Sequence, residues 1–210
     1  MRTISITQAL NELKLYNEKI LKSIEKINLV GYAKKSFDKI GALTKDEYQE
    51  NCKSDYQSLT DIISNRNHIK SAIVKSNSVT EVKIGETIMT VAEAIERKTS
   101  IQYDELLLDK MKVQYAAATS NVERENKRVD AKVDELIATL VGKDSQKKLS
   151  EDDQRNVEIP YRKANEYELV DPLNLNDKIK KLEAEIDDFK SNVDTALSIS
   201  NATTFVELDF

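Results

Sequence analysis

The chain has 210 residues, of which 40% are hydrophobic and 33% are charged, with four Gly, two Pro and no Trp. This composition is typical of long helices that bury a narrow apolar stripe and expose a broad charged face. The net charge of -5 comes from 32 basic and 37 acidic residues interleaved along the chain, which disfavours the clustered basic surface of a nucleic-acid-binding protein.

Two capping-box patterns open the first two predicted helices. A short strand over 3–6 leads into the first pattern, Ser5 with Gln8, and Thr44 with Glu47 forms the second. Apolar residues recur at helical spacing after each pattern. We therefore predict two antiparallel helices in the first part of the chain, with a connecting loop between them.

The apolar period changes after the second helix. Valine and isoleucine alternate with polar residues over 79–84, Gly85 follows, and another short run covers 87–90. A glycine between two alternating runs is typical of a hairpin turn. We predict a β-hairpin that turns near Gly85.

Thr90 and Glu93 form a third capping box, which opens a helix predicted to continue to Val141. Its apolar residues repeat every seven positions, at Ile101, Leu108, Tyr115, Val122, Val129 and Leu136. Such a stripe is typical of a coiled-coil helix, here roughly 75 Å long. Gly142 is placed to end the helix.

The residues over 142–172 are predicted as a loop insertion, because most of them are polar or charged and lack an apolar period. A last helix begins near Pro172, with Asp171 or a nearby Asn as its cap, and carries a regular two-position apolar stripe. We expect this helix to end near Asn201 and a final strand to cover 203–208.

Two pairs of segments in the chain look duplicated. Residues 5–11 match 90–96 at an offset of 85, and residues 62–84 match 186–208 at an offset of 124. Each half of the chain is therefore predicted to run strand, helix, helix, strand. Repeats of this kind usually pack about a pseudo-two-fold axis.

The duplication defines the predicted fold, which is mainly α. Two pseudo-repeated antiparallel helical hairpins, over 1–88 and 89–210, form a four-helix bundle or coiled coil. A small β element of short strands lies at one end. We expect the two repeats to make one structural domain.

The far part of the long helix has no equally long partner within the chain. The apolar residues of this part are Val122, Val129, Val133, Leu136 and Leu140. Either residues 143–172 fold back over them, or the same region of another copy covers them. We favour the second alternative, a homo-oligomer that uses these residues as its contact.

Four short motifs carry a resemblance to a known family. They are Ile6-Thr7-Gln8-Ala9-Leu10, then Ser76-Asn77 with Thr80 and Gly85-Glu86-Thr87, then Thr90 to Arg97, and finally Asn201 to Leu208. In this order they resemble the septicolysin-like family of small bacterial and phage proteins. The resemblance covers most of the chain apart from the loop after the first helix and the insertion in the second half. It implies no particular activity, cofactor or site residue.

The sequence offers few of the residues that catalytic sites use. His68 is the only histidine, which excludes histidine-rich metal sites and paired di-iron motifs. The chain has no glycine-rich phosphate-binding motif. Cys52 is the only cysteine, so no intramolecular disulfide can form, and it falls on the apolar side of its helix with Leu59, so we interpret it as a buried, inert thiol. We expect no metal, no cofactor and no enzymatic activity.

One polar constellation occurs twice at matched positions. Its two copies are Ser76, Asn77 and Thr80, and Ser200, Asn201 and Thr204. Asn tolerates the left-handed conformation after a helix, and Thr can bond the freed carbonyls, so a structural helix-to-strand junction explains both copies. If the pseudo-two-fold axis brings the copies together, they instead line a small polar pocket for a ligand.

These patterns predict a non-enzymatic helical interaction protein that self-associates through its extended coiled coil and binds a protein partner. If it is phage-encoded, we expect a virion or assembly component, or an inhibitor of a host factor. No stretch approaches the roughly 18 apolar residues that cross a bilayer, so we expect a cytoplasmic or virion protein that binds neither membrane nor nucleic acid. The alternative is a small-ligand-binding or sequestering protein with a polar pocket at the strand end of the bundle.

Overall fold

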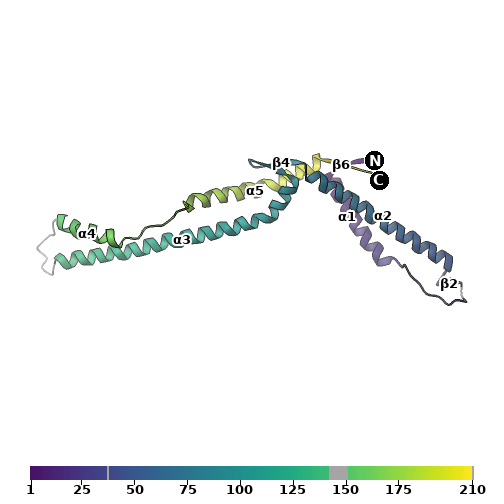
Figure 1. Cartoon of the computed structure of the whole chain (residues 1–210), viewed down its shortest axis with the longest axis horizontal. Helices are drawn as coiled ribbons and strands as arrows, with labels where there is room; N and C mark the ends of the chain where they lie inside the picture. The colour runs from purple at the N-terminus through teal and green to yellow at the C-terminus, as the bar shows by residue number, and fades with distance from the viewer. Residues whose placement is uncertain (37, 142–150, 210) are drawn as a thin grey trace. The chain divides into compact units, whose positions relative to one another are not determined.

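The computed structural model describes residues 1–36, 38–141 and 151–209. These residues form five helices and six short strands (Figure 1). The strands pair two by two in antiparallel sheets. The predicted class, mainly helical with a few short antiparallel strands, is confirmed.

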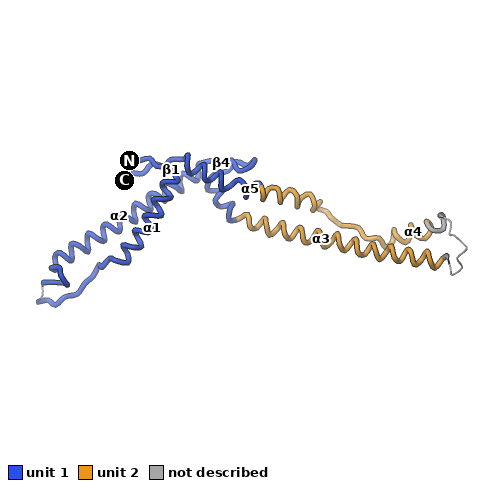
Figure 2. Tube along the Cα trace, turned by 180° about the vertical axis from the view of Figure 1, so that it is seen from behind, with its two compact units in different colours: residues 1–99, 188–210 blue, residues 100–187 orange. Residues whose placement is uncertain are grey.

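The chain divides into two compact units, which are coloured separately in Figure 2. Unit 1 combines residues 1–99 with residues 188–210, and unit 2 consists of residues 100–187. Both ends of the chain belong to unit 1, because its first strand pairs with its last.

Unit 1 contains two complete helices, α1 (Ile6–Lys26) and α2 (Lys45–Asn77), which lie side by side and run antiparallel (Figure 1). α1 begins with the predicted capping box, in which the Ser5 hydroxyl accepts the Gln8 N–H and the Gln8 side chain accepts the Ser5 N–H. The box predicted for α2 is also present. These reciprocal bonds satisfy backbone N–H groups that the start of a helix leaves free.

The connection between these helices ends in a small hairpin. Its strands are β2 (Lys39–Ile40) and β3 (Leu43–Thr44), and Gly41 turns between them with a φ of +60°. Strands of two residues are too short to show an alternating pattern, so sequence analysis treats the whole connection as a loop.

The remaining four strands of unit 1 form two sheets. β4 (Glu81–Ile84) pairs with β5 (Thr87–Thr90), as the predicted hairpin about Gly85. β1 (Arg2–Ser5) pairs with β6 (Phe205–Leu208). The second sheet therefore joins segments from opposite ends of the chain.

The two sheets share one register. Ile84 pairs with Thr87 in one sheet, and Leu208 pairs with Arg2 in the other. These are equivalent pairs, because the offset of 124 relates Ile84 to Leu208 and the offset of 85 relates Arg2 to Thr87. The split sheet of the chain ends thus reproduces the pairing of the continuous hairpin.

Burial in unit 1 repeats at the same offsets. One buried cluster contains Ile6, Ala9, Ile69, Val206 and Leu208. The equivalent positions are also buried, and they are Val91, Ala94, Val193, Val82 and Ile84. The duplicated sequence pattern therefore places matched side chains in the interior of both copies.

The longest helix, α3 (Val91–Val141), is continuous over 51 residues, as its apolar repeat predicts. At its start the Thr90 N–H donates to the Glu93 carboxylate at 2.7 Å, and the Glu93 N–H donates to the Thr90 hydroxyl at 3.2 Å. The predicted capping box is therefore formed. The end predicted at Gly142 lies outside the described residues.

The last helix, α5 (Leu175–Thr203), begins and ends slightly later in the chain than predicted. The Asp171 carboxylate accepts the N–H of Leu175 at 2.7 Å and that of Leu173 at 3.3 Å, so the predicted cap is correct. Asn174 has a left-handed backbone with a φ of +52°, which places the start of the helix after it.

The predicted loop insertion over 142–172 is wrong for residues 151–165, which form α4 (Glu151–Asn165). Val157 and Tyr161 lie four residues apart and are half-buried, so the helix has a narrow apolar face. A pair of residues is too small a pattern to mark a helix by period alone. Residues 142–150 lie outside the described residues.

Candidate functional site

The two copies of the polar constellation are helix-to-strand junctions with the same backbone bonds. The Thr80 N–H donates to the Ser76 carbonyl, and the Thr204 N–H donates to the Ser200 carbonyl, both at 2.9 Å. The side chains of the first copy are also close, since the Ser76 and Thr80 hydroxyl oxygens are 3.4 Å apart. The geometry of both copies fits a structural role.

One expectation about these junctions is wrong. Asn77 is the last residue of α2 and Asn201 lies within α5, and among the described non-glycine residues only Asn174 has a positive φ. Neither predicted Asn therefore supplies a left-handed turn. At the first junction the helical backbone continues instead, and the Ser78 N–H donates to the Val74 carbonyl at 3.1 Å.

A surface hollow of about 290 Å³ lies beside the second junction. Thr80 and Lys83 line it from the first repeat, and Ser200, Thr203 and Thr204 line it from the second. The structure thus brings one residue of the first copy next to two of the second. The other three predicted site residues, Ser76, Asn77 and Asn201, do not line this hollow.

The residues predicted as an oligomer contact are largely covered within unit 2. Val129 and Val133 are buried, with Val133 only 2% exposed, and Val122 and Leu136 are half-buried. Leu140 is 57% exposed. α4 lies beside this part of α3 (Figure 1), which corresponds to the predicted alternative in which the chain folds back.

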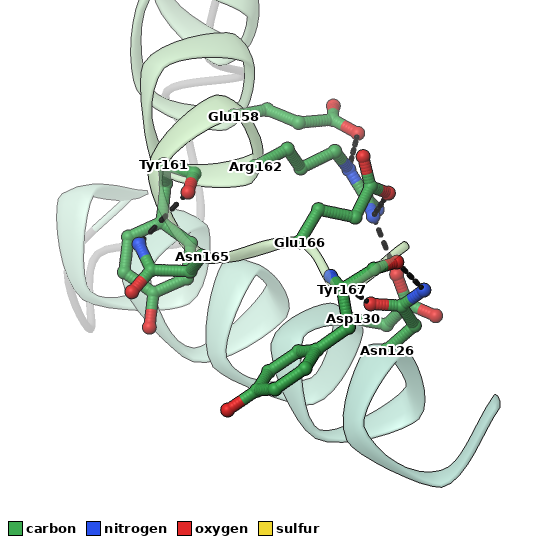
Figure 3. A network of polar contacts seen from close by, with 8 residues as sticks. All are labelled: Asn126, Asp130, Glu158, Tyr161, Arg162, Asn165, Glu166 and Tyr167. Atoms are coloured by element: carbon green, nitrogen blue, oxygen red, sulfur yellow. Dashed lines mark hydrogen bonds and ion pairs between the residues drawn. The ribbon is translucent and has the colours of Figure 1, made fainter. Parts of the chain in front are cut away.

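An arginine holds α4 against α3 (Figure 3). The Arg162 guanidinium donates to Asp130 on α3 at 2.6 Å and to Glu158 on α4 at 2.8 Å, and Glu166 lies 3.5 Å away. The bond to Asp130, followed by that to Glu158, raises the pKa of Arg162 above its ordinary value. We call these four residues the Arg162 cluster.

The extended chain after α4 is bound by a side-chain amide of α3 (Figure 3). Asn126 donates from Nδ2 to the Tyr167 carbonyl at 2.9 Å and accepts the Tyr167 N–H at 2.8 Å. Farther back along α3, Lys112 forms an ion pair with Glu183 on α5 at 2.5 Å. The residues bound to α3 have lower sequence numbers where the α3 residues have higher ones, so the returning chain runs antiparallel to α3.

A second apolar stripe on α3 is exposed. Tyr103, Leu106, Leu107 and Val113 are between 52% and 67% exposed, and Ala117 is also exposed. At about 100° of rotation per residue, these positions fall within an arc of about 120°, so they share one face of the helix. We call these five residues the exposed stripe. Ile101 and Leu108, on the other side of α3, are buried.

The sequence contains a sign of this stripe that the heptad analysis does not use. The ten residues 113–122 include no charged side chain, although a third of the whole chain is charged. This segment contains Val113 and Ala117 of the exposed stripe, and depletion of charge is typical of the centre of a protein–protein interface. The exposed stripe is therefore the principal candidate site in the described part of the chain.

Comparisons with known protein families, with curated proteins and with solved structures find no match. Every described helix is too short or too polar to cross a membrane. Among the described residues, no group of three or more His, Cys, Asp and Glu side chains is arranged to hold a metal ion.

Proposed function

We propose that this protein is a non-enzymatic helical interaction protein whose binding element is the exposed stripe of α3. The observation that carries the proposal is the exposure of Tyr103, Leu106, Leu107 and Val113, each more than half accessible to water. A solvated helix usually places charged side chains on such a face. The ligand we propose is an amphipathic helix of a protein, laid along α3.

The size of the stripe is consistent with reversible binding. Burying a fully exposed large apolar side chain contributes about 1.5–3 kcal/mol, so four half-exposed ones offer roughly 4 kcal/mol before the costs of association. The uncharged neighbours over 113–122 add contact without the cost of desolvating charges. A contact with these properties fits regulated assembly better than a permanent subunit interface.

The finer architecture is part of this proposal. We propose that the two repeats are antiparallel helical hairpins of common design, and that the chain is related to the septicolysin-like family. The contact between α1 and α2, the shared sheet register and the matched buried positions support the first point. The short motifs given above support the second.

A photo-crosslinking amino acid placed at Leu106 tests the function. We expect irradiation in an extract of the producing cells to give one adduct of defined mass, whose cross-linked peptide belongs to an amphipathic helix. The matched control places the same amino acid at Glu123, an exposed residue on the charged side of α3, and should give no such adduct. Equal adducts at both positions, or none at Leu106, would contradict the proposal.

A second candidate function is supported by the hollow beside the second junction. Thr80, Ser200 and Thr204, which all carry hydroxyl groups, line a hollow of about 290 Å³, close to the lower size of small-molecule sites. Native mass spectrometry of the purified chain would show a retained ligand as added mass. The variant Thr80→Val/Thr204→Val, which changes two lining residues, should lose the added mass, whereas Asn77→Ala/Asn201→Ala, which changes none, should keep it and lower only the melting temperature.

A further inference from the structure

We infer that the helix bound by the exposed stripe is the same stripe of a second copy, in antiparallel orientation about a two-fold axis. This inference rests on the proposed function and goes further, because it identifies the partner and its direction. It follows from the order of large and small side chains along α3 and from the position of Lys110.

The exposed face of α3 changes from large to small side chains along its length. Its first half carries Tyr103, Leu106 and Leu107, and its second half carries Ala117 and Ser120, all of which are exposed. Two parallel copies would set large residues against large ones and leave a gap between the small ones. Two antiparallel copies set these large residues against the small ones, as close packing requires.

One register satisfies all of these pairs together. When Leu106 lies opposite Ala117 of the second copy, Tyr103 lies opposite Ser120. The two-fold axis then crosses α3 between Met111 and Lys112. Each contact occurs twice by symmetry, which makes the surface isologous. The alanines allow the two helix axes to approach to about 8 Å.

Lys110, a charged residue near the centre of the face, also favours the antiparallel direction. In a parallel pair the two Lys110 side chains would lie directly opposite each other, and their ammonium groups would repel. A charged residue at a central position specifies helix orientation through such repulsion. In the antiparallel register Lys110 lies opposite Val113. Its aliphatic stem can cover the valine while the ammonium group reaches water at the edge.

The extent of the contact sets the expected strength. The segment from Tyr103 to Ser120 is about 27 Å long, so the total area is at the low end for specific interfaces, below roughly 1,200 Å². We therefore expect a reversible dimer with a dissociation constant on the order of 10 μM rather than an obligate one. The mass of the species in solution should rise from that of one 23.9 kDa chain to twice that value with concentration.

Light scattering after size exclusion tests the face. The variant Leu106→Glu/Leu107→Glu should remain monomeric at every concentration at which the unmodified chain is a dimer, with an unchanged circular dichroism spectrum because both residues are exposed. The matched control Leu140→Glu alters an exposed leucine of the same helix and should leave the dimer intact. A chain that is monomeric up to about 1 mM, or a dimer lost only in Leu140→Glu, would overturn the inference.

Disulfide trapping tests the direction. In a Cys52→Ser background, Val113→Cys should form a covalent dimer under oxidation, because the two copies of residue 113 lie about 4.5 Å apart along the axis. Tyr103→Cys should not, since its two copies are about 25 Å apart. A mixture of Leu106→Cys with Ala117→Cys should give the mixed dimer. Efficient trapping of Tyr103→Cys would show a parallel pair and overturn the inference.

The two proposals fail in different ways. An adduct at Leu106 with the mass of two copies of this chain supports both of them. An adduct with a different protein, together with a monomeric purified chain, keeps the proposed function and overturns the second-copy partner. Absence of any adduct at Leu106 together with a monomeric chain overturns both.

Discussion

The carboxylate of Asp188 occupies the space that a Cβ atom on Gly85 would need. Gly85 turns the hairpin between β4 and β5 with a φ of +57°. Asp188 lies on α5, where the Asn192 side chain donates to its Oδ1 at 2.9 Å. The hairpin turn and α5 therefore meet at a position where the backbone conformation requires glycine and where the Asp188 carboxylate fills the adjacent space.

Replacing Gly85 with Ala should destabilise unit 1 through both requirements. The left-handed backbone alone costs about 1–2 kcal/mol for a residue with a Cβ, and displacement of Asp188 adds to it. Gly41→Ala is the matched control, because Gly41 has a φ of +60° with open space around it. In urea unfolding, Gly85→Ala should be less stable than Gly41→Ala. The double variant Gly85→Ala/Asp188→Ala should lose only as much free energy of unfolding as Gly41→Ala does. Equal costs for the two single variants would show that Asp188 moves aside freely.

The start of α3 should make stability depend on pH. The bond from the Thr90 backbone N–H, followed by that from its hydroxyl, lowers the pKa of Glu93 below its ordinary value of 4.5. Because the native pKa is lowered, the stability that the ionised Glu93 cap contributes is complete above pH 4.5 and is lost as the pH falls through the native pKa. Gln8, in the equivalent position of α1, makes the same cap without a charge.

The variant Glu93→Gln isolates this effect. It should retain the cap but lose the titration, so the difference in stability between the variant and the unmodified chain should shrink between about pH 5 and about pH 3. Urea unfolding at several pH values measures it. Gln8→Glu is the reciprocal test and should add pH dependence to α1. A constant difference across this range would contradict the prediction.

The sequence predicts those elements of this fold that depend on interactions between residues close together in the chain. The capping boxes at Ser5, Thr44 and Thr90 depend on residues three apart, and the strands around Gly85 depend on alternation. These elements form as predicted. The length of α3 follows in the same way, since nothing in its sequence interrupts the helical period.

The covering of α3 is not predictable from such patterns. α3 carries apolar residues on two faces, with Leu106 and Leu107 on one and Leu108 on the other, and period alone does not tell which face the chain covers. That choice depends on distant polar contacts, such as the bond between Asn126 and the backbone of Tyr167. A heptad count finds the covered stripe, and only the structure shows that the other is exposed.

The Arg162 cluster should hold α4 on α3. Arg162→Ala removes the ion pairs to Asp130, Glu158 and Glu166, so we expect faster amide hydrogen exchange across α4. Exchange in α1 and α2 should not change. Arg155→Ala is the control, because Arg155 is exposed on the same helix. Unchanged exchange in Arg162→Ala would show that apolar contacts alone hold α4 in place.

Val133 and Leu140 should respond differently to truncation, because one is covered by its own chain and the other is not. Val133 is 2% exposed, so Val133→Ala should cost about 2 kcal/mol. Leu140 is 57% exposed, and Leu140→Ala should cost less than about 0.5 kcal/mol. Intrachain packing predicts that both values are independent of protein concentration, which thermal unfolding over a wide range of concentrations would measure. If the loss of stability grew with protein concentration at both sites, these residues would contact another copy, as the heptad pattern alone predicts. The reason is that only association makes stability depend on the amount of protein.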